Sequence, residues 1–356
     1  DSNIKKVLKR DCDIEIDVDA YDWLILVGSD ALKYFTSVNS VTEYSGKKVE
    51  EKFLPVINPA MLAFKPEAQR TWDDSKKSIT EYINGNVVDV VITEHNAYGI
   101  QDTDEANEWL CRCINSRPAY VALDSETTGL YPRDGHMLGI SLSYEEDRGV
   151  YIDTQCFDER TEALLQTLFN QTRIVFHNAK FDMAFFEYHF NFKFPNFEDT
   201  MLLHYLIDEN PGTHGLKQLA MKYTVYGDYE KPQYDWMAQY RKDHGMLKND
   251  FTWDLIPFDI MKTYAAMDAV VTLLIFNKFI KIKQNKRLAK VYDNILIPGC
   301  RFLTDIQDNG VPFDVERLCQ SQQLMQVQID EAVAKLYEHP AISKFEEING
   351  KDFNPN

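Results

Sequence analysis

Three closely spaced strands followed by a strand–helix unit are the feature of this sequence that most restricts its fold. Residues 119–123 form an apolar run, and residues 138–144 alternate between large apolar and small side chains with a period of two. Residues 149–152 form a third short apolar run. A fourth run at 173–176 leads into a helical pattern at 179–190. Consecutive strands followed by strand–helix alternation predict an α/β fold with a mixed β-sheet and flanking helices.

The texture of the sequence divides the chain into three regions. Its 356 residues suffice for two or three domains. Residues 1–83 predict a small α/β segment, and 84–86 a linker. Residues 86–290 hold the strand–helix pattern, and residues 291–356 predict a mostly helical segment interrupted at 308–314. The other predicted elements are strands at 23–28 and 53–57 and helices at 67–83, 160–170, 199–208, 215–223 and about 259–280.

The formal net charge of −18 argues against a protein that coats nucleic acid through bulk positive charge. It does not argue against a nuclease. Carboxylates that bind divalent cations make a site acidic, and the cations then meet the phosphates.

Targeting signals and cysteine use predict a cytoplasmic protein without a membrane span. No apolar run reaches the roughly 18–20 residues that cross a bilayer, and the first six residues lack the apolar core of a secretory signal. The six cysteines are scattered apart from Cys111 and Cys113, which have no second Cys or His cluster nearby and do not predict a zinc site. The chain lacks an initiator Met and ends on turn residues at 353–356, so we expect both ends to be cut or processed points.

Two carboxylates follow the apolar strand at 119–123 directly. Asp124 and Glu126 are two apart in an extended segment, so they project to the same side. Like charges so close are costly unless a cation lies between them. Taken alone, the pair also fits a solvated acidic strand end.

Two further acidic positions lie at later points of the same pattern. Asp182 falls in the first turn of the predicted helix at 179–190, where an acid also suits the helix dipole. Tyr264 and Asp268 are four apart in the last helix and therefore share a face. A buried tyrosine with a polar partner explains that second pair equally well when it is considered alone.

Together, these motifs resemble the three exonuclease motifs of the DEDD exonuclease superfamily, in its tyrosine-containing branch. The resemblance implies a ribonuclease H-like fold and two divalent metal ions, Mg²⁺ or Mn²⁺, which prefer carboxylate oxygens. It implies that the metal ligands are Asp124, Glu126, Asp182 and Asp268. It also implies that Tyr264, with Glu126, orients the attacking water. Asn178 and Leu130 match positions near the terminal nucleotide.

Three more segments, at 198–203, 214–220 and 297–314, resemble family A DNA polymerases, and 353–356 resemble the start of the next polymerase motif. The implied function is proofreading, in which 3′-terminal nucleotides are removed from DNA as 5′-monophosphates. The implied partners are the 3′ end of single-stranded DNA and a polymerase domain or subunit, whose palm and fingers this chain lacks. Two alternatives stay open: a stand-alone RNA-trimming exonuclease of the same superfamily, and a catalytically silent DNA-holding module of a split polymerase.

The first 83 residues resemble the C-terminal part of the uracil-DNA glycosylase superfamily. The resemblance lies in residues 24–28, 46–48 and 54–60, but Asn58 stands where that family usually has a histidine. The N-terminal half with the water-activating loop is absent, so we expect a DNA-holding or structural role without glycosylase activity. A generic α/β appendage is the alternative. Phage-type family A polymerases carry such an extension, which suggests a phage-infected or bacterial cell as the setting.

A cluster of basic residues lies between positions 278 and 290. It comprises Lys278, Lys281, Lys283, Lys286, Arg287 and Lys290. These residues could follow a DNA-phosphate path. A solvated helix end explains them equally well, because basic residues suit a helix C-terminus.

Overall fold

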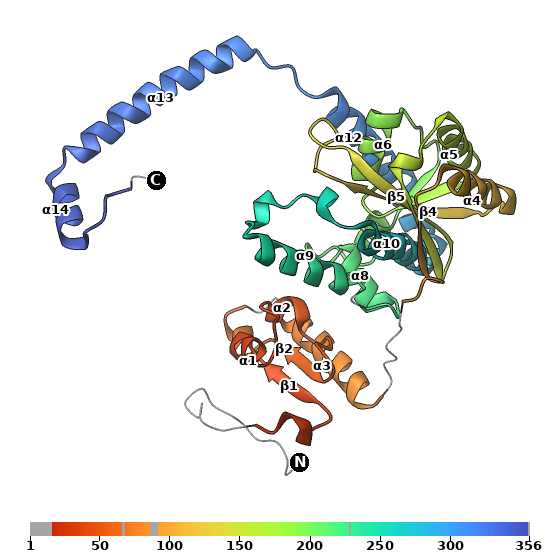
Figure 1. Ribbon diagram of the computed structural model, residues 1–356, viewed down its shortest axis with the longest axis horizontal. Helices are drawn as coiled ribbons and strands as arrows, with labels where there is room; N and C mark the ends of the chain where they lie inside the picture. The colour runs from red at the N-terminus through yellow and green to blue at the C-terminus, as the bar shows by residue number, and fades with distance from the viewer. Residues whose placement is uncertain (1–15, 66–67, 86–91, 228, 355–356) are drawn as a thin grey trace. The chain divides into compact units, whose positions relative to one another are not determined.

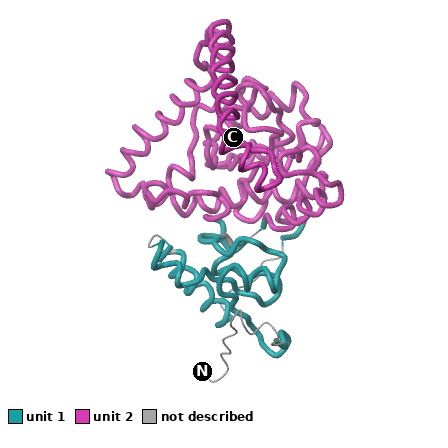
Figure 2. Tube along the Cα trace, turned by 90° about the vertical axis from the view of Figure 1, so that its left-hand side faces the viewer, with its two compact units in different colours: residues 1–93, 220–229 teal, residues 94–219, 230–356 magenta. Residues whose placement is uncertain are grey.

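A computed structural model describes residues 16–65, 68–85, 92–227 and 229–354. The chain forms two compact units, residues 1–93 with 220–229 and residues 94–219 with 230–356 (Figure 2). The predicted N-terminal segment up to residue 15, the end of the predicted linker at residue 86 and the last two residues lie outside the described part. The predicted division into three regions at 86 and 290 stays a prediction.

The first unit contains a two-stranded parallel sheet flanked by short helices (Figure 1). Leu26, Leu32 and Ile57 are fully or almost fully buried in its core. The strands and the last helix lie where the apolar runs and the helical pattern predict them. The elements are β1 (Leu24–Val27), α1 (Ser29–Phe35), α2 (Val41–Tyr44), β2 (Phe53–Val56) and α3 (Gln69–Ile83).

The second unit is built on a six-stranded mixed sheet with the order β3-β6-β5-β4-β7-β8 (Figure 1). Strand β5 runs antiparallel to both neighbours, and the other pairs are parallel. The five strands β6-β5-β4-β7-β8 have the order of a ribonuclease H-like sheet, so the predicted fold class is confirmed. The strands are β3 (Ala97–Ile100), β4 (Tyr120–Thr127), β5 (Met137–Glu145), β6 (Arg148–Asp153), β7 (Arg173–Phe176) and β8 (Phe197–Asp199).

One face of this sheet is covered by three helices. Leu110, Leu168 and Phe186 come from these helices and share one apolar core with Leu123 and Ile174 of the sheet. Such burial of helix stripes against one sheet face is the main stabilising term of an α/β unit. The helices are α4 (Thr103–Ser116), α5 (Glu159–Gln171) and α6 (Ala179–Phe190).

The opposite face is covered by the long helix α10 (Phe258–Phe279), which packs on strands β3 to β6. Most residues from Ala265 to Phe276 are buried, so the helix is apolar nearly all round. Gly149 permits the close approach, since a Cβ there would lie 2.2 Å from the carbonyl oxygen of Ala266. This packing fixes the height of α10 over the sheet, and with it the positions of its polar side chains.

The remaining helices belong to the second unit, except for residues 220–223 of α8, which belong to the first. α12 packs on α6, α13 has no buried residue among those described, and α14 contacts α13. The mostly helical prediction for residues 291–356 is confirmed for the described residues. The helices are α7 (Thr200–Tyr205), α8 (Leu216–Tyr223), α9 (Lys231–His244), α11 (Lys286–Val291), α12 (Ile297–Asn309), α13 (Val315–Tyr337) and α14 (Pro340–Asn349).

Several elements were not predicted, among them α1, α2, β3, β8, α4 and α9, and one predicted helix was too long. β3 and β8 are only four and three residues long, and α4 and α9 are rich in polar residues, so none stands out as an apolar run. The helix predicted at 199–208 covers only Thr200–Tyr205, since Asp199 caps its start and the chain turns at residues 206–207. Within the described part of the chain, no helix has the length and apolarity that crossing a membrane requires.

Candidate active site

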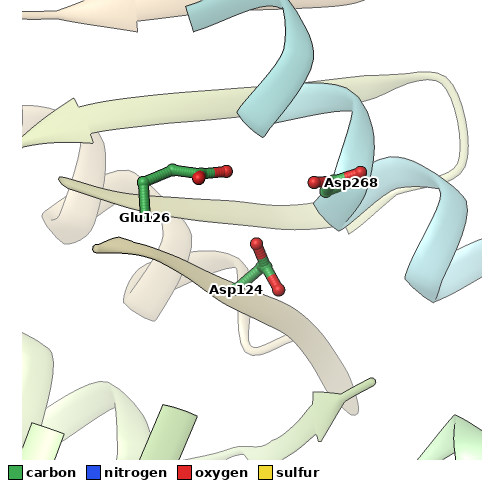
Figure 3. Close-up of side chains that lie close together, drawn as sticks. All are labelled: Asp124, Glu126 and Asp268. Atoms are coloured by element: carbon green, nitrogen blue, oxygen red, sulfur yellow. The ribbon is translucent and has the colours of Figure 1, made fainter. Parts of the chain in front are cut away.

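Three acidic side chains converge where β4 ends beneath α10. Asp124 and Glu126 project from the same face of β4, and Asp268 comes down from α10 (Figure 3). Their ligand oxygens all lie within 4.8 Å of one another. Glu126 and Asp268 are buried, with 5% and 4% of their surface exposed. The strand period of two and the packing of α10 therefore produce one compact carboxylate cluster.

The carboxylates of this cluster are wholly or partly buried and repel one another. Burial raises the pKa of Asp124 well above its usual range, and the nearby Asp182 adds to the rise. Burial also raises the pKa of Glu126 well above its usual range, and the negative charges of Asp124 and Asp268 raise it further. Among the described residues, Oε1 of Glu126 is buried and has no hydrogen-bond partner. A divalent cation between these oxygens would relieve both the repulsion and the missing partner.

Asp182 lies beside this cluster but is not one of its three members. It sits in the first turn of α6, and its Oδ1 accepts hydrogen bonds from the backbone N (3.0 Å) and Oγ (2.6 Å) of Ser125. Burial raises the pKa of Asp182 to about 7, and these hydrogen bonds act in the opposite direction. The structure thus brings the ligand oxygens of three of the four predicted metal ligands within 4.8 Å of one another. The fourth, Asp182, is hydrogen-bonded to Ser125.

The segment at residues 198–203 contacts the start of α6 through Asp199. The buried carboxylate of Asp199 accepts hydrogen bonds from the backbone N of Ala179 (2.8 Å), at the start of α6, and of Met201 (2.8 Å), at the start of α7. Asn178 has the left-handed backbone conformation (φ 71°), which asparagine tolerates better than most residues. The segment at 198–203 therefore has a structural role, because Asp199 within it orients the helix that carries Asp182.

A cavity of about 400 Å³ opens over the carboxylates. Its size falls in the range of small-ligand sites, roughly 300–1,000 Å³. Tyr264 and Leu130 line it, whereas Asn178 and Asp182 are not among its described lining residues. The lining residues are Asp124, Ser125, Glu126, Thr127, Thr128, Gly129, Leu130, His177, Phe181, Leu216, Glu230, Trp253, Tyr264 and Asp268.

The lining residues that were not predicted as site residues include Glu230 and Trp253. Glu230 has 6% of its surface exposed and an ion pair with Lys217 at 3.3 Å, and its charge helps to raise the pKa of Glu126. The Trp253 ring lies 5.8 Å from the ring of Tyr264. Neither residue belongs to one of the three motifs, so the fold was needed to place them in the cavity.

The basic cluster at 278–290 loses one member to structural pairing. Lys283 forms ion pairs with Glu198 (3.1 Å) and Asp293 (2.8 Å), and its ammonium group lies 4.6 Å from the centre of the Tyr292 ring. Glu198 is itself almost fully buried, with 1% exposed. Lys283 is thus held within the fold, and the choice between a DNA path and a solvated helix end concerns the other five residues.

The sequence of this chain is similar to those of known exonucleases and DNA polymerases. The sequence profile of the 3′–5′ exonuclease family matches residues 98–283. The DNA polymerase of Escherichia phage T5 is 41% identical over 353 residues, which cover 96% of this chain and 41% of the phage protein. DNA polymerase I of Borreliella burgdorferi is 28% identical over 206 residues, covering 56% of this chain and 21% of that protein. The structure of Escherichia coli RNase D, an exoribonuclease, is 18% identical with a TM-score of 0.45, covering 61% of this chain and 52% of that one.

The matched region has two properties that decide the family. It covers more than half of this chain, and it includes the whole mixed sheet except the first residue of β3, together with all three exonuclease motifs. The chain spans less than half the length of the two polymerases compared above. This chain belongs to the 3′–5′ exonuclease family, in the form found in family A DNA polymerases.

Proposed function

We propose that this chain is a metal-dependent exonuclease that removes 3′-terminal nucleotides from DNA as 5′-monophosphates. It would serve as the proofreading part of a family A DNA polymerase. The observation that carries the proposal is the cluster of Asp124, Glu126 and Asp268, whose ligand oxygens lie within 4.8 Å of one another beneath the cavity. Such a set of carboxylate ligands binds hard divalent cations.

The residues present fit two Mg²⁺ or Mn²⁺ ions. The three clustered carboxylates would hold them directly, and the unpartnered Oε1 of Glu126 is an open ligand position. Asp182 would complete the set from the edge, in the orientation that Ser125 gives it. Two such ions supply Lewis-acid stabilisation of the attacking and leaving oxygens in a phosphodiester hydrolysis.

Tyr264 is the residue to which we assign the positioning of the attacking water. It lies one helical turn before Asp268 on α10 and lines the cavity. Its phenol would accept or donate a hydrogen bond to the water while Glu126 accepts another. Leu130, on the β4–β5 loop, would contact the terminal nucleotide, and Asn178 would lie near it.

The polymerase setting rests on the relatives. The phage T5 and Borreliella proteins are both named DNA polymerases and are longer than this chain. We therefore propose that the substrate is the 3′ end of single-stranded DNA and that a polymerase domain or subunit accompanies this chain. We also propose that the N-terminal unit holds DNA or serves a structural role without glycosylase activity. Asn58, at the position where the glycosylase family usually has a histidine, accepts a hydrogen bond from the backbone N of Ala60 and caps a short helix.

The experiment is a degradation assay on single-stranded DNA and RNA of equal sequence, with Mg²⁺ or Mn²⁺. We expect release of 5′-mononucleotides from the 3′ end of DNA, with no activity in EDTA or in the Asp124→Ala/Glu126→Ala double variant. Activity that persists in EDTA would refute the metal mechanism. A clear preference for RNA would favour the RNA-trimming alternative, and a metal-loaded but inactive chain would favour a silent module.

A further inference from the structure

The loop between β4 and β5, residues 128–136, carries two exposed apolar side chains at the rim of the cavity. Leu130 lines the cavity and is 75% exposed, and Tyr131 directly after it is 59% exposed. Among the residues that the structure describes, no other ring stacks on Tyr131, no cation lies over its ring, and its hydroxyl makes no hydrogen bond. A ring that is more than half exposed and unstacked can take a base on its face.

The loop restrains the backbone of Tyr131. Its two ends are joined at Thr128 and His136, where each backbone N donates to the other residue, to the His136 carbonyl oxygen and to Oγ1 of Thr128, at 3.0 Å each. The carbonyl oxygen of Tyr131 accepts a hydrogen bond from the backbone N of Gly135 at 3.0 Å. Pro132 also restricts the residue before it to extended conformations. A ring on such a preorganised loop binds a ligand at a small cost in conformational entropy.

A further contact joins the loop to α12, and its charges nearly cancel. Nη2 of Arg133 donates to the carbonyl oxygen of Asp308, at the end of α12, at 2.8 Å. Residues 128–136 contain one Arg and one Asp, so the loop does not attract phosphates through a surplus of positive charge. Stacking on an aromatic ring holds a strand without such a surplus, and it is the contact that this loop can offer.

The position of Tyr131 next to Leu130 matches the spacing of nucleotides in a strand. A cavity of about 400 Å³ lies near the lower end of the range for small-ligand sites, so it suits one nucleotide, and the rest of the strand leaves over its rim. Adjacent Cα atoms are about 3.8 Å apart, and stacked nucleotides of one strand are about 3.4 Å apart. If Leu130 contacts the terminal nucleotide, Tyr131 is therefore within reach of the next one.

We propose that Tyr131 stacks on the base of the nucleotide next to the 3′-terminal one and so positions single-stranded DNA at the cavity. This inference rests on the proposed function and names a substrate-positioning residue outside the cavity. Every base has a π-face, so stacking on this ring tolerates any sequence, as an editing enzyme requires. An exposed tyrosine without a ligand is the alternative, and a strand that lacks this one base separates the two.

The test removes the ring and the base in turn. Tyr131→Ala is compared with the wild-type chain on a thymidine dodecamer and on the same strand with an abasic site next to the 3′-terminal nucleotide. On the intact strand we expect KM to rise roughly 5- to 150-fold, as for the loss of one stacked base, with kcat retained. On the abasic strand the two proteins should have similar KM values. An equal rise of KM on both strands would overturn the proposal.

Two further variants control for the hydroxyl group and for the loss of any exposed tyrosine. Tyr131→Phe retains the ring and should keep the wild-type KM on both strands. If it behaved like Tyr131→Ala, the hydroxyl would be the contact and stacking would be refuted. Tyr188→Ala removes a tyrosine of α6 that is 50% exposed and lies outside the described lining of the cavity, and it should leave both KM values unchanged.

A second arm measures binding and does not depend on cleavage. A dodecamer with 2-aminopurine next to the 3′-terminal nucleotide is bound in EDTA at saturating protein. Stacking quenches the fluorescence of this base analogue, so we expect a weaker signal in the complex with the wild-type chain than in the complex with Tyr131→Ala. Equal signals would refute the stacking contact. If the wild-type chain binds DNA but never degrades it with metal, the proposed function fails while this arm still decides the further inference.

Discussion

The backbone N and the hydroxyl group of Ser125 donate to the same carboxylate oxygen of Asp182, at 3.0 and 2.6 Å. This contact joins two motifs that are 57 residues apart in the chain. Ser125 lies between Asp124 and Glu126 on β4 and points to the opposite face from them. Residues 124–126 therefore supply two carboxylates to the cluster and also position the carboxylate of Asp182 beside it.

Replacing Ser125 by alanine should remove the shorter of these two hydrogen bonds. A hydrogen bond to a charged group contributes about 1.5–3 kcal/mol, so we expect a loss of that order in the free energy of unfolding, and a several-fold lower kcat as Asp182 loses its fixed orientation. Urea unfolding and steady-state assays measure the two effects. Ser141→Ala is the control, because the Ser141 hydroxyl is buried without a described partner and its removal should be neutral or stabilising. Equal losses in both variants would contradict the role of Ser125.

Tyr264→Phe should lower kcat while metal binding is retained. The phenylalanine ring can keep the contact with Trp253, at 5.8 Å in the native pair, and only the hydroxyl is lost. Positioned acid–base groups contribute 10²–10⁴-fold, so we expect a drop of roughly 10²-fold. Isothermal titration with Mn²⁺ follows metal affinity. A loss of Mn²⁺ affinity as large as that of Asp268→Ala would show that the tyrosine supports the metal site instead.

Without metal, the stability of the chain should fall as pH rises. The folded-state pKa values of Asp124 and Glu126 are raised, so between about pH 4 and those values the folded state binds more protons than the unfolded state. The contribution of these groups is therefore fully present below their unfolded pKa values and is lost as pH rises through the folded ones.

Mg²⁺ replaces those protons, so the gain in Tm on adding Mg²⁺ should increase from about pH 5 to about pH 8. Thermal unfolding in EDTA and in excess Mg²⁺ across this range measures both slopes. The Asp124→Ala/Glu126→Ala variant should show a flatter slope and little gain. A gain that decreases with pH would be inconsistent with metal binding at these carboxylates.

Gly149→Ala should disturb α10 and the site it carries. The new Cβ would lie 2.2 Å from the carbonyl oxygen of Ala266, two residues from Asp268, and the backbone cannot yield as a flexible side chain would. Overpacking of this kind costs about 1–3 kcal/mol, and we expect Mn²⁺ affinity to fall as Asp268 shifts. Gly299→Ala in α12 is the matched control. It meets nothing within 4 Å and should stabilise the chain by up to about 1 kcal/mol.

Local periodicity predicted four of the six strands of the mixed sheet and the side of β4 from which Asp124 and Glu126 project, because a strand repeats every two residues and a helix every three to four. The residues of the three motifs were identified by their resemblance to a known exonuclease family. Periodicity also predicted α6 and α10 nearly to the residue. The short strands β3 and β8 and the polar helix α9 gave little periodic signal, whereas Ala106, Trp109, Leu110 and Cys113 of α4 recur at helical spacing and could have predicted that helix.

How the three motifs meet in space could not be predicted from the sequence. Asp268 reaches the β4 carboxylates because Gly149 lets α10 approach the sheet, and Asp182 turns to Ser125 because Asp199 caps the start of its helix. Glu230 and Trp253 enter the cavity from segments that no motif marks. Such contacts depend on packing between elements distant in sequence, and the spacing of residues along the chain carries no record of that packing.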